Sequence, residues 1–249
     1  MTLTTICTGS SGNCYVLRDA SSALVLEAGA KPLDVLKTGV QLSEIVAVLI
    51  THEHQDHARY AAMWAYRYHR PVYCSLGTAH ALRCHSMVFR TAIFGELLME
   101  GNWHIVPFMI RHDAAQPVGW YIANGAERIL FITDTAPIAY NFRGMRPTTI
   151  IVESNWCQDK LERMDDIRLA GRISRSHLSD EMAADLIRAN ATSDLRHIVL
   201  THLSNDNSDE ARAVVLAQQA APTANVYAAR AGQTIDISTT IYNAKYETK

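Results

Sequence analysis

The chain has 249 residues, a length that suits one large domain or two small ones and allows a substantial buried core. Hydrophobic residues make up 48% of the chain and charged residues only 19%, which excludes an intrinsically disordered protein. The formal net charge of −2 excludes a bulk electrostatic attraction to nucleic acids or membranes, although it is compatible with a local basic groove.

The cysteines and the apolar runs indicate in which cellular compartment the protein is expected. The five cysteines are odd in number and form no CxxC pair, which favours a reducing environment. No apolar run approaches the roughly 18 residues of a membrane span, and the first residues lack the pattern of a secretion signal. We therefore expect a cytoplasmic protein with no membrane partner.

The predicted strands begin with a β-hairpin over residues 2–8 and 14–17, followed by a strand over residues 23–26. Four later apolar runs indicate buried strands, and each ends abruptly in polar residues. They cover residues 46–50, 129–132, 149–152 and 198–200, and they are followed by Thr51-His52, Thr133-Asp134, Glu153-Ser154 and Thr201-His202. Because polar endings recur at four strand tips, we expect the tips to converge on one site.

Two helices with clear boundary signals lie between and after the later strands. The first is predicted over residues 180–189, with Ser179 as N-cap and Met182, Leu186 and Ile187 as its buried stripe. The second is predicted over residues 208–221, with acidic residues in its first turn and Pro222 as its stop. Strands interleaved with helices predict a layered α/β domain.

The strongest chemical signal is the segment Thr51-His52-Glu53-His54-Gln55-Asp56-His57, which follows a predicted buried strand. In a turn after a strand, these side chains can fold inward around a cation. Imidazole and carboxylate are the usual ligands of zinc, manganese and iron. A solvated histidine-rich loop is the alternative, but it leaves the candidate ligands at later strand ends unexplained.

The order of these residues resembles the metal motifs of the metallo-β-lactamase superfamily, and within it the YycJ-like (WalJ-like) branch, whose members are regarded as DNA exonucleases. The segments that carry the resemblance are Gly9-Ser10-Ser11-Gly12-Asn13, His52-x-His54-x-Asp56-His57, His112-Asp113-Ala114-Ala115, Thr133-Asp134-Thr135, Glu153-Ser154-Asn155 and His202-Leu203-Ser204-x-Asp206-Asn207. The resemblance covers nearly the whole chain. It implies a four-layer αββα metallo-β-lactamase fold of class α/β, as a single domain over residues 1–249.

The resemblance also implies a centre of two divalent metal ions. The first metal would be held by His52, His54 and His112, the second by Asp56, His57 and His202, with Asp134 bridging both. Such a pair can share a hydroxide that acts as the nucleophile, and Asp56 is assigned to catalysis as well. Five imidazoles favour Zn²⁺, and the carboxylates keep Mn²⁺ compatible with the site.

Further residues are given supporting roles by the same resemblance. The Ser176-His177-Leu178-Ser179 segment, expected to open a helix, is similar to a histidine element of phosphodiesterases such as ribonuclease Z. It implies His177 as a proton donor. Glu153 is expected to orient a site histidine, and the turn with Ser11 and Asn13 to offer backbone N–H groups to phosphate. A helix-capping histidine, a structural carboxylate and a simple hairpin turn are the alternatives.

Two features leave alternatives open. The family's usual Asp-x-Gly motif is replaced by Glu27-Ala28-Gly29, so the longer carboxylate must reach a ligand differently. Basic and aromatic residues after the metal segment are compatible with a nucleic-acid platform or with a helix that packs an aromatic face; they are Arg59, Trp64, Tyr66, Arg67, Tyr68 and Arg70.

Together these patterns predict a binuclear metal-dependent phosphodiester hydrolase, a DNA exonuclease-like nuclease. The alternative is a phosphodiesterase for small cyclic nucleotides of the phage anti-defence type, which the near-neutral charge suits better. A lactonase or thioesterase and a non-catalytic metal-binding module are further readings. The resemblance also allows a homodimer, which no residue pattern in the chain indicates.

Overall fold

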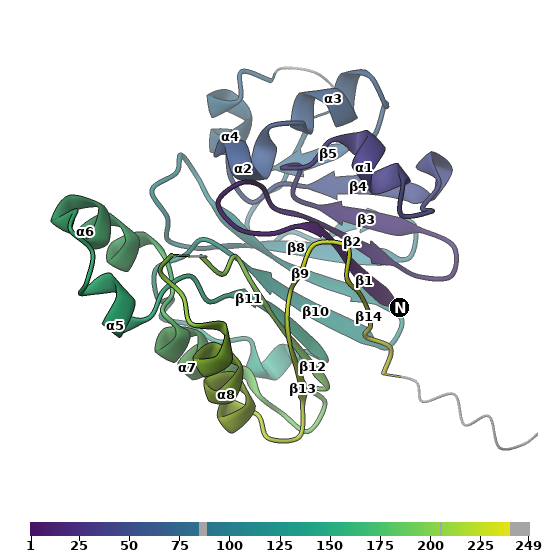
Figure 1. Ribbon diagram of the computed structural model, residues 1–249. Coiled ribbons are helices and arrows are strands. Elements are labelled where there is room, and N and C mark those ends of the chain that lie inside the picture. Colours follow the sequence, from purple (N-terminus) through teal and green to yellow (C-terminus); the bar gives the residue numbers. More distant parts are fainter. Residues whose placement is uncertain (85–88, 205, 240–249) are drawn as a thin grey trace, which may run out of the picture.

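The computed structural model describes residues 1–84, 89–204 and 206–239, and within them two seven-stranded sheets (Figure 1). The predicted domain of residues 1–249 therefore extends beyond the described residues. In sheet order, the first sheet contains β14 (Thr234–Asp236), β1 (Thr2–Cys7), β2 (Cys14–Arg18), β3 (Ala23–Leu26), β4 (Ile45–Leu49), β5 (Val72–Cys74) and β6 (Phe89–Thr91). The second contains β13 (Asn225–Ala228), β12 (His197–Thr201), β11 (Thr149–Glu153), β10 (Glu127–Ile132), β9 (Val118–Asn124), β8 (Trp103–Met109) and β7 (Leu98–Glu100).

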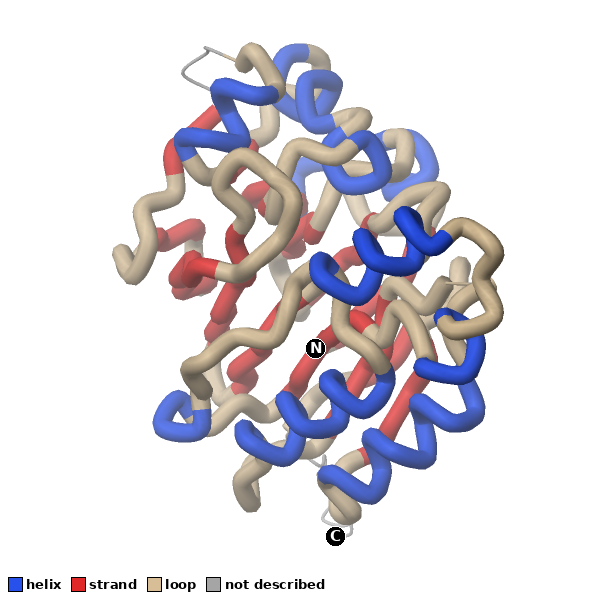
Figure 2. Tube along the Cα trace, turned by 90° about the vertical axis from the view of Figure 1, so that its left-hand side faces the viewer, coloured by secondary structure: helices blue, strands red, loops and turns tan. Residues whose placement is uncertain are grey.

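Helices cover the outer face of each sheet, and Figure 2 shows the strands between the two groups of helices. The first sheet carries α1 (Pro32–Leu36), α2 (Gln55–Ala58), α3 (Ala61–Tyr66) and α4 (Leu76–Ala81). The second carries α7 (Asp180–Asn190) and α8 (Glu210–Ala220), with α5 (Gln158–Leu161) and α6 (Ile167–Ser176) at its edge. Two 3₁₀ turns cover Leu42–Glu44 and Arg143–Met145. None of the described helices is both long and apolar enough to cross a bilayer.

Three apolar clusters lie between these layers and hold them together by burial of hydrophobic surface. The cluster between the sheets includes Leu24 and Leu26 of the first sheet and Trp103, Trp120 and Phe131 facing them from the second. A second cluster lies beneath α1–α4, and a third lies beneath α7 and α8. The order helix, sheet, sheet, helix confirms the predicted four-layer αββα fold.

Parallel pairing brings the strand tips to one edge. Strands β10, β11 and β12 are parallel neighbours, with Phe131 opposite Ile151 and Ile151 opposite Val199. Their carboxyl ends therefore meet at the same edge of the second sheet. In the first sheet, β3 and β4 are also parallel, so the segments that follow them leave the sheet together.

Several predicted elements are confirmed, with differences at their ends. The N-terminal strands pair as an antiparallel meander, and α7 begins after Ser179, whose hydroxyl accepts from the Met182 N–H. The predicted stripe of α7 is only partly right, because Met182 and Leu186 are half-buried and Ala183 and Ala184 take their place beside Ile187. Helix α8 begins at Glu210, with Asp209 as its N-cap rather than inside its first turn.

Candidate metal centre and active site

The segment after β4 is held in place by the turn that follows β1. The Asn13 N–H donates to the Asp56 carbonyl at 2.7 Å, and the Ala28 N–H donates to the His57 carbonyl at 2.6 Å. Gly29 makes this approach feasible, since a Cβ there would lie only 2.0 Å from the Asp56 carbonyl oxygen. Three segments distant in sequence therefore meet through backbone contacts and fix the histidine-rich loop.

His52, His54 and His112 form the first cluster of candidate ligands. One ring nitrogen from each lies within 4.8 Å of the others, and His112 Nε2 is 3.3 Å from His54 Nδ1. His112 Nδ1 donates to the Ser176 carbonyl at 2.9 Å, so Nε2 is left with its lone pair directed at the cluster. This is the arrangement that orients a metal-binding histidine.

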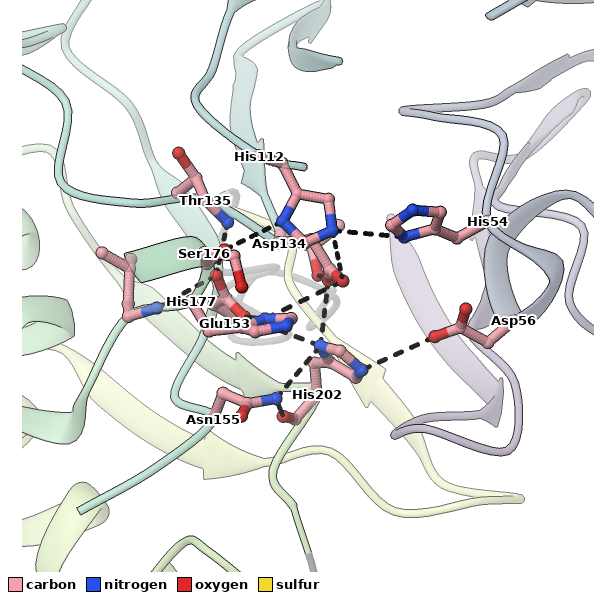
Figure 3. Close-up of polar contacts among 12 residues, drawn as sticks. His54, Asp56, His112, Asp134, Thr135, Glu153, Asn155, Ser176, His177 and His202 are labelled. Atoms are coloured by element: carbon pink, nitrogen blue, oxygen red, sulfur yellow. Dashed lines mark hydrogen bonds and ion pairs between the residues drawn. The ribbon is translucent and has the colours of Figure 1, made fainter. Parts of the chain in front are cut away.

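The second cluster contains Asp56, His57, Asp134 and His202. Figure 3 labels Asp56, Asp134 and His202 and shows them close together. His57 Nε2 is 3.2 Å from Asp56 Oδ2 and 3.3 Å from Asp134 Oδ2. His202 Nδ1 is 2.9 Å from Asp134 Oδ1. Asp134 also faces the first cluster, with Oδ2 3.7 Å from His112 Nε2 and 3.9 Å from His52 Nε2. Asp134 therefore lies between the two clusters, which together contain all seven predicted ligands.

The charges of the buried groups differ across the two clusters. Burial lowers the pKa of His52 well below its usual range and also lowers that of His112, which keeps both rings neutral. Burial would lower the pKa of His202 as well, but the Asp134 carboxylate outweighs it and raises this pKa to about 10. Neutral imidazole is the form that binds metal, so His52 and His112 are ready to bind, whereas a metal ion would displace the proton that Asp134 favours on His202.

The donor set fits divalent metal ions. His52 Nε2 and His202 Nε2 are buried, and neither has a hydrogen-bond partner among the residues that the structure describes. Leaving such groups unpaired costs about 1–3 kcal/mol each, which ligation by a cation would offset. Together with Asp134 between them, the two clusters indicate a divalent-metal site, as the sequence predicted.

Three residues that face this centre have a strained backbone. Glu27, Asp134 and His202 have φ of 65°, 49° and 49°, in the left-handed region that side chains other than glycine rarely adopt. They directly follow or lie just beyond β3, β10 and β12. Each such conformation costs on the order of 1–3 kcal/mol and clusters at functional sites. No signal in the sequence predicted this strain.

Glu153 and His177 lie beside the second cluster. Glu153 is fully buried at the end of β11, and its Oε2 is 2.9 Å from His177 Nδ1 (Figure 3). Burial alone would lower the pKa of His177, but the Glu153 carboxylate outweighs it and raises this pKa above its usual value. Glu153 also accepts from the Thr135 N–H at 2.6 Å.

The segment over residues 176–179 leads into a helix as predicted, but His177 itself lies at the end of the preceding helix. Helix α6 ends at Ser176, and the His177 N–H donates to the Ile173 carbonyl, closing its last turn. Three residues later, Ser179 caps α7. His177 therefore lies in the short connection between α6 and α7, two residues before the predicted N-cap Ser179.

The turn after β1 bonds mainly to itself and to the metal loop. The Asn13 side chain accepts from the Gly9 N–H at 3.0 Å, and its Nδ2 is 3.2 Å from His57 Nε2. Asn13 is buried, whereas Ser11 is exposed and does not line the cavity at the metal centre. Its neighbour Ser10 does line that cavity. Of the two predicted turn residues, Ser11 and Asn13, only Asn13 contacts a site histidine.

Glu27 takes the place of the family's usual aspartate and still faces a candidate ligand. Its Oε1 is 3.5 Å from His57 Nδ1, and its Oε2 accepts from the Thr51 N–H at 3.3 Å. Burial raises the pKa of Glu27, although His57 acts in the opposite direction. The left-handed backbone at Glu27 accompanies the longer side chain at this position.

The basic and aromatic segment after the metal loop packs as a helix face. Trp64 is fully buried in the cluster beneath α1–α4, and its ring centroid is 5.5 Å from that of Tyr68. Tyr66 is exposed but lies beside Phe89, with ring centroids 6.2 Å apart. These contacts favour the packing alternative over a nucleic-acid platform.

The site opens into a cavity of about 360 Å³. Besides the candidate ligands, its lining includes Ser10 and Ser204 from the motif segments, and Leu169, Arg172 and Ile173, which the sequence did not single out. Asn155 lies there as well, and its Nδ2 donates to the His202 carbonyl at 3.2 Å. Helix α6 contributes three of these residues, and the sequence offered no motif that marked it.

A model of the beta-lactamase superfamily domain matches residues 15–203. The chain belongs to the metallo-β-lactamase superfamily. Over 223 residues it is 28% identical to exodeoxyribonuclease YycJ of Bacillus anthracis, a match that covers 82% of each chain. It is 24% identical to exodeoxyribonuclease WalJ of Streptococcus pneumoniae over 219 residues, covering 82% of this chain and 81% of that one. These similarities confirm the predicted YycJ-like placement.

Among solved structures, the metallo-β-lactamase fold protein YhfI of Bacillus subtilis is similar to this chain, with a TM-score of 0.73 at 17% identity. The match covers 94% of this chain and 99% of YhfI. At that identity the likeness concerns the fold, which it confirms. The superfamily and the named nuclease relatives identify the chain as a metal-dependent hydrolase.

Proposed function

We propose that this protein is a binuclear metal-dependent phosphodiesterase that degrades DNA from strand ends. The observation that carries the proposal is the Glu153–His177 pair, 2.9 Å apart and next to Asp134 in an open cavity. An imidazole held by a carboxylate suits the protonation of an alkoxide leaving group, which phosphodiester hydrolysis requires.

In the proposed reaction, water adds to phosphorus, the bond from phosphorus to the leaving oxygen breaks, and that oxygen takes a proton. With Nδ1 bonded to Glu153, Nε2 of His177 is the nitrogen that would deliver this proton. Glu153 fixes the orientation of the ring and favours its charged form. Donation of the proton leaves a neutral ring, which can recover a proton from the attacking water.

The proposed ligands are His52, His54 and His112 for one metal and Asp56, His57 and His202 for the other, with Asp134 shared. Two bound divalent ions would lower the pKa of water and neutralise charge that develops on the phosphoryl oxygens. We infer Zn²⁺ as the favoured metal from the five imidazoles, with Mn²⁺ as the alternative.

DNA is inferred as the substrate because YycJ and WalJ are named exodeoxyribonucleases, and their matches cover 82% of this chain. The five free cysteines suit action in a reducing cytoplasm. A homodimer remains a prediction from the family resemblance.

A cyclic-nucleotide phosphodiesterase is the second candidate. The cavity of about 360 Å³ has the size of a small-ligand site. A net charge of −2 gives the chain as a whole no electrostatic attraction to a polyanionic substrate such as DNA. A small cyclic phosphodiester would also use the same proton donor.

A turnover panel of linear DNA, RNA and cyclic mononucleotides, each with Zn²⁺ and Mn²⁺, tests the two candidates. We expect the highest kcat/KM on linear DNA and release of mononucleotides from its ends. If the protein hydrolyses cyclic mononucleotides but does not hydrolyse DNA, the second candidate replaces the first. Hydrolysis of lactones or thioesters alone would remove both.

A further inference from the structure

Helix α6 separates the metal cavity from a second, larger cavity. This neighbour has a volume of about 530 Å³, and three arginines line it: Arg111, Arg172 and Arg175. We call it the arginine pocket. Arg172, His112 and Ser176 line both cavities, so the two are neighbours that share one wall.

The arginine pocket is strongly positive in a chain whose net charge is −2. All three guanidinium-bearing residues are exposed, and Asp113 is the one carboxylate among the lining residues. Arg172 Nε donates to Asp113 Oδ2 at 2.7 Å, a bond that uses Nε and does not involve the two Nη groups, so three guanidinium groups face one carboxylate in the pocket. Arginine presents several N–H groups in a plane that matches the oxygens of a phosphate.

The small residue Gly171 gives Arg175 room along the helix. A Cβ at Gly171 would lie 3.3 Å from Arg175 Nη1, so the guanidinium lies back over the backbone one turn earlier. A larger residue there would push it away. The helix therefore presents Arg172 and Arg175 from neighbouring positions at the same mouth.

Apolar side chains accompany these charges. Ile167 is 83% exposed and Leu169 is 42% exposed in the first turn of α6, and Leu169 lines the metal cavity. Leu169 and Arg172 line the same cavity, and an apolar group beside a guanidinium matches a ligand that combines apolar surface with phosphates. A polynucleotide strand has this composition, with apolar base faces and one phosphate per residue.

We propose that the arginine pocket binds the backbone of a polynucleotide strand whose end lies in the metal cavity, with Arg172 and Arg175 as phosphate-binding residues. This inference rests on the phosphodiesterase function proposed above and narrows it to polymeric substrates. A cyclic mononucleotide has a single phosphate, which would lie at the metals and leave the arginine pocket unused.

The test compares a double variant, Arg172→Ala with Arg175→Ala, with a matched control that also removes two exposed arginines. Arg188→Ala with Arg196→Ala is that control, because neither residue lines either cavity. Anisotropy of a labelled single-stranded oligonucleotide is measured in EDTA, so metal content and cleavage play no part. In parallel, kcat/KM is measured with metal for the oligonucleotide and for bis(p-nitrophenyl) phosphate.

For the pocket variant, we expect at least tenfold weaker binding of the oligonucleotide. We also expect at least a tenfold fall in the ratio of kcat/KM for the oligonucleotide to kcat/KM for bis(p-nitrophenyl) phosphate. The slope of log K against log salt should become shallower by about 1.4, since each phosphate contact on a single strand contributes about 0.7. The control variant should keep the binding, the ratio and the slope of the wild type.

Three results overturn the inference, and they are distinguishable. Equal losses in both variants would show a general charge effect, and no loss in the pocket variant would show that the arginines hold no phosphate. In either case cleavage of DNA by the wild type would leave the proposed function intact. A wild type that hydrolyses the nitrophenyl diester but neither binds nor cleaves the oligonucleotide would remove the DNA function as well.

Discussion

Asp134 joins the two ligand clusters because its two carboxylate oxygens face different histidines. Oδ1 is 2.9 Å from His202 Nδ1 of the second cluster, whereas Oδ2 is 3.7 Å from His112 Nε2 of the first. Asp134→Ala should abolish hydrolysis and lower the bound metal, while circular dichroism remains native because the core is apolar.

A second substitution separates charge from backbone strain at this position. Asp134 has φ of 49°, a conformation that asparagine tolerates and alanine does not. Asp134→Asn should therefore lose activity as Asp134→Ala does while unfolding closer to the wild-type temperature. Activity within about tenfold of wild type in either variant would show that Asp134 is not shared between metals.

His177 should affect chemistry rather than metal content. General acid catalysis typically contributes about 10²–10⁴-fold, so His177→Ala should lower kcat by that order on a DNA substrate. The loss should shrink on a nitrophenyl phosphodiester, whose leaving oxygen hardly needs a proton. Elemental analysis checks the alternative, since His177 also lies within a possible ligand group with Asp134, Glu153 and His202.

Glu153→Gln provides the matched test of the pair, because it keeps the size of the side chain and removes its charge. We expect a smaller kcat loss than for His177→Ala and an alkaline limb of the pH–rate profile shifted to lower pH. Equal losses of His177→Ala on good and poor leaving groups would assign His177 to positioning. Loss of metal would assign it to ligation.

At the scale of elements, three segments meet at Gly29. A Cβ there would lie 2.0 Å from the Asp56 carbonyl oxygen and 2.5 Å from the Asn13 nitrogen, both backbone atoms. Gly29→Ala should therefore displace the metal loop, lower metal content and reduce the free energy of unfolding by more than 2 kcal/mol, the range of overpacked sites.

Gly144→Ala is the control for this substitution, because a Cβ there would meet no atom within 4 Å. It should change stability by less than about 1 kcal/mol, as expected for an unstrained site. Urea denaturation of both variants measures the difference. Similar stabilities and metal contents for the two would show that the contact at Gly29 does not shape the metal loop.

The sequence predicted the strands and their polar tips because those elements carry strong local signals. Buried parallel strands such as β10 and β11 are continuous apolar runs, and an abrupt polar residue marks each end. The cluster from His52 to His57 is equally local. The N-cap of α7 was predicted because a serine hydroxyl before a helix has one common role.

Helix α6 was missed because its burial pattern is weak. Of its ten residues only Ile173 and Ser176 are buried, and Ile167 and Leu169 are exposed, so no core-facing stripe exists to detect. The left-handed backbone at Asp134 and His202 was equally hidden, because tertiary contacts impose it on residues that do not prefer it. The arginine pocket was not predicted either, because α6 supplies two of its three arginines, Arg172 and Arg175.

At the scale of the whole molecule, the metal centre lies across the two sheets. The loop from His52 to His57 follows β4 of the first sheet, whereas Asp134 and His202 follow β10 and β12 of the second. Ions bound between them would link the layers by ligand bonds in addition to apolar burial. Metal binding should therefore contribute to the stability of the entire fold, not only to the reaction.

This link predicts two metals per chain and a fall in melting temperature on their removal. Ligands at 100 times their dissociation constant stabilise a fold by about 2.7 kcal/mol, and each kcal/mol shifts Tm by about 2–4 °C at this size. Chelation should thus lower Tm by roughly 5–10 °C. Protein purified without chelator should give a metal ratio near two by elemental analysis.

His202→Ala supplies the comparison, because it removes a ligand of one proposed ion and leaves the cluster of His52, His54 and His112 complete. Its metal ratio should fall toward one, and chelation should lower its Tm by less than that of the wild type. A ratio near one in both proteins would rule out the binuclear centre. An unchanged Tm on chelation would show that the ions do not join the sheets.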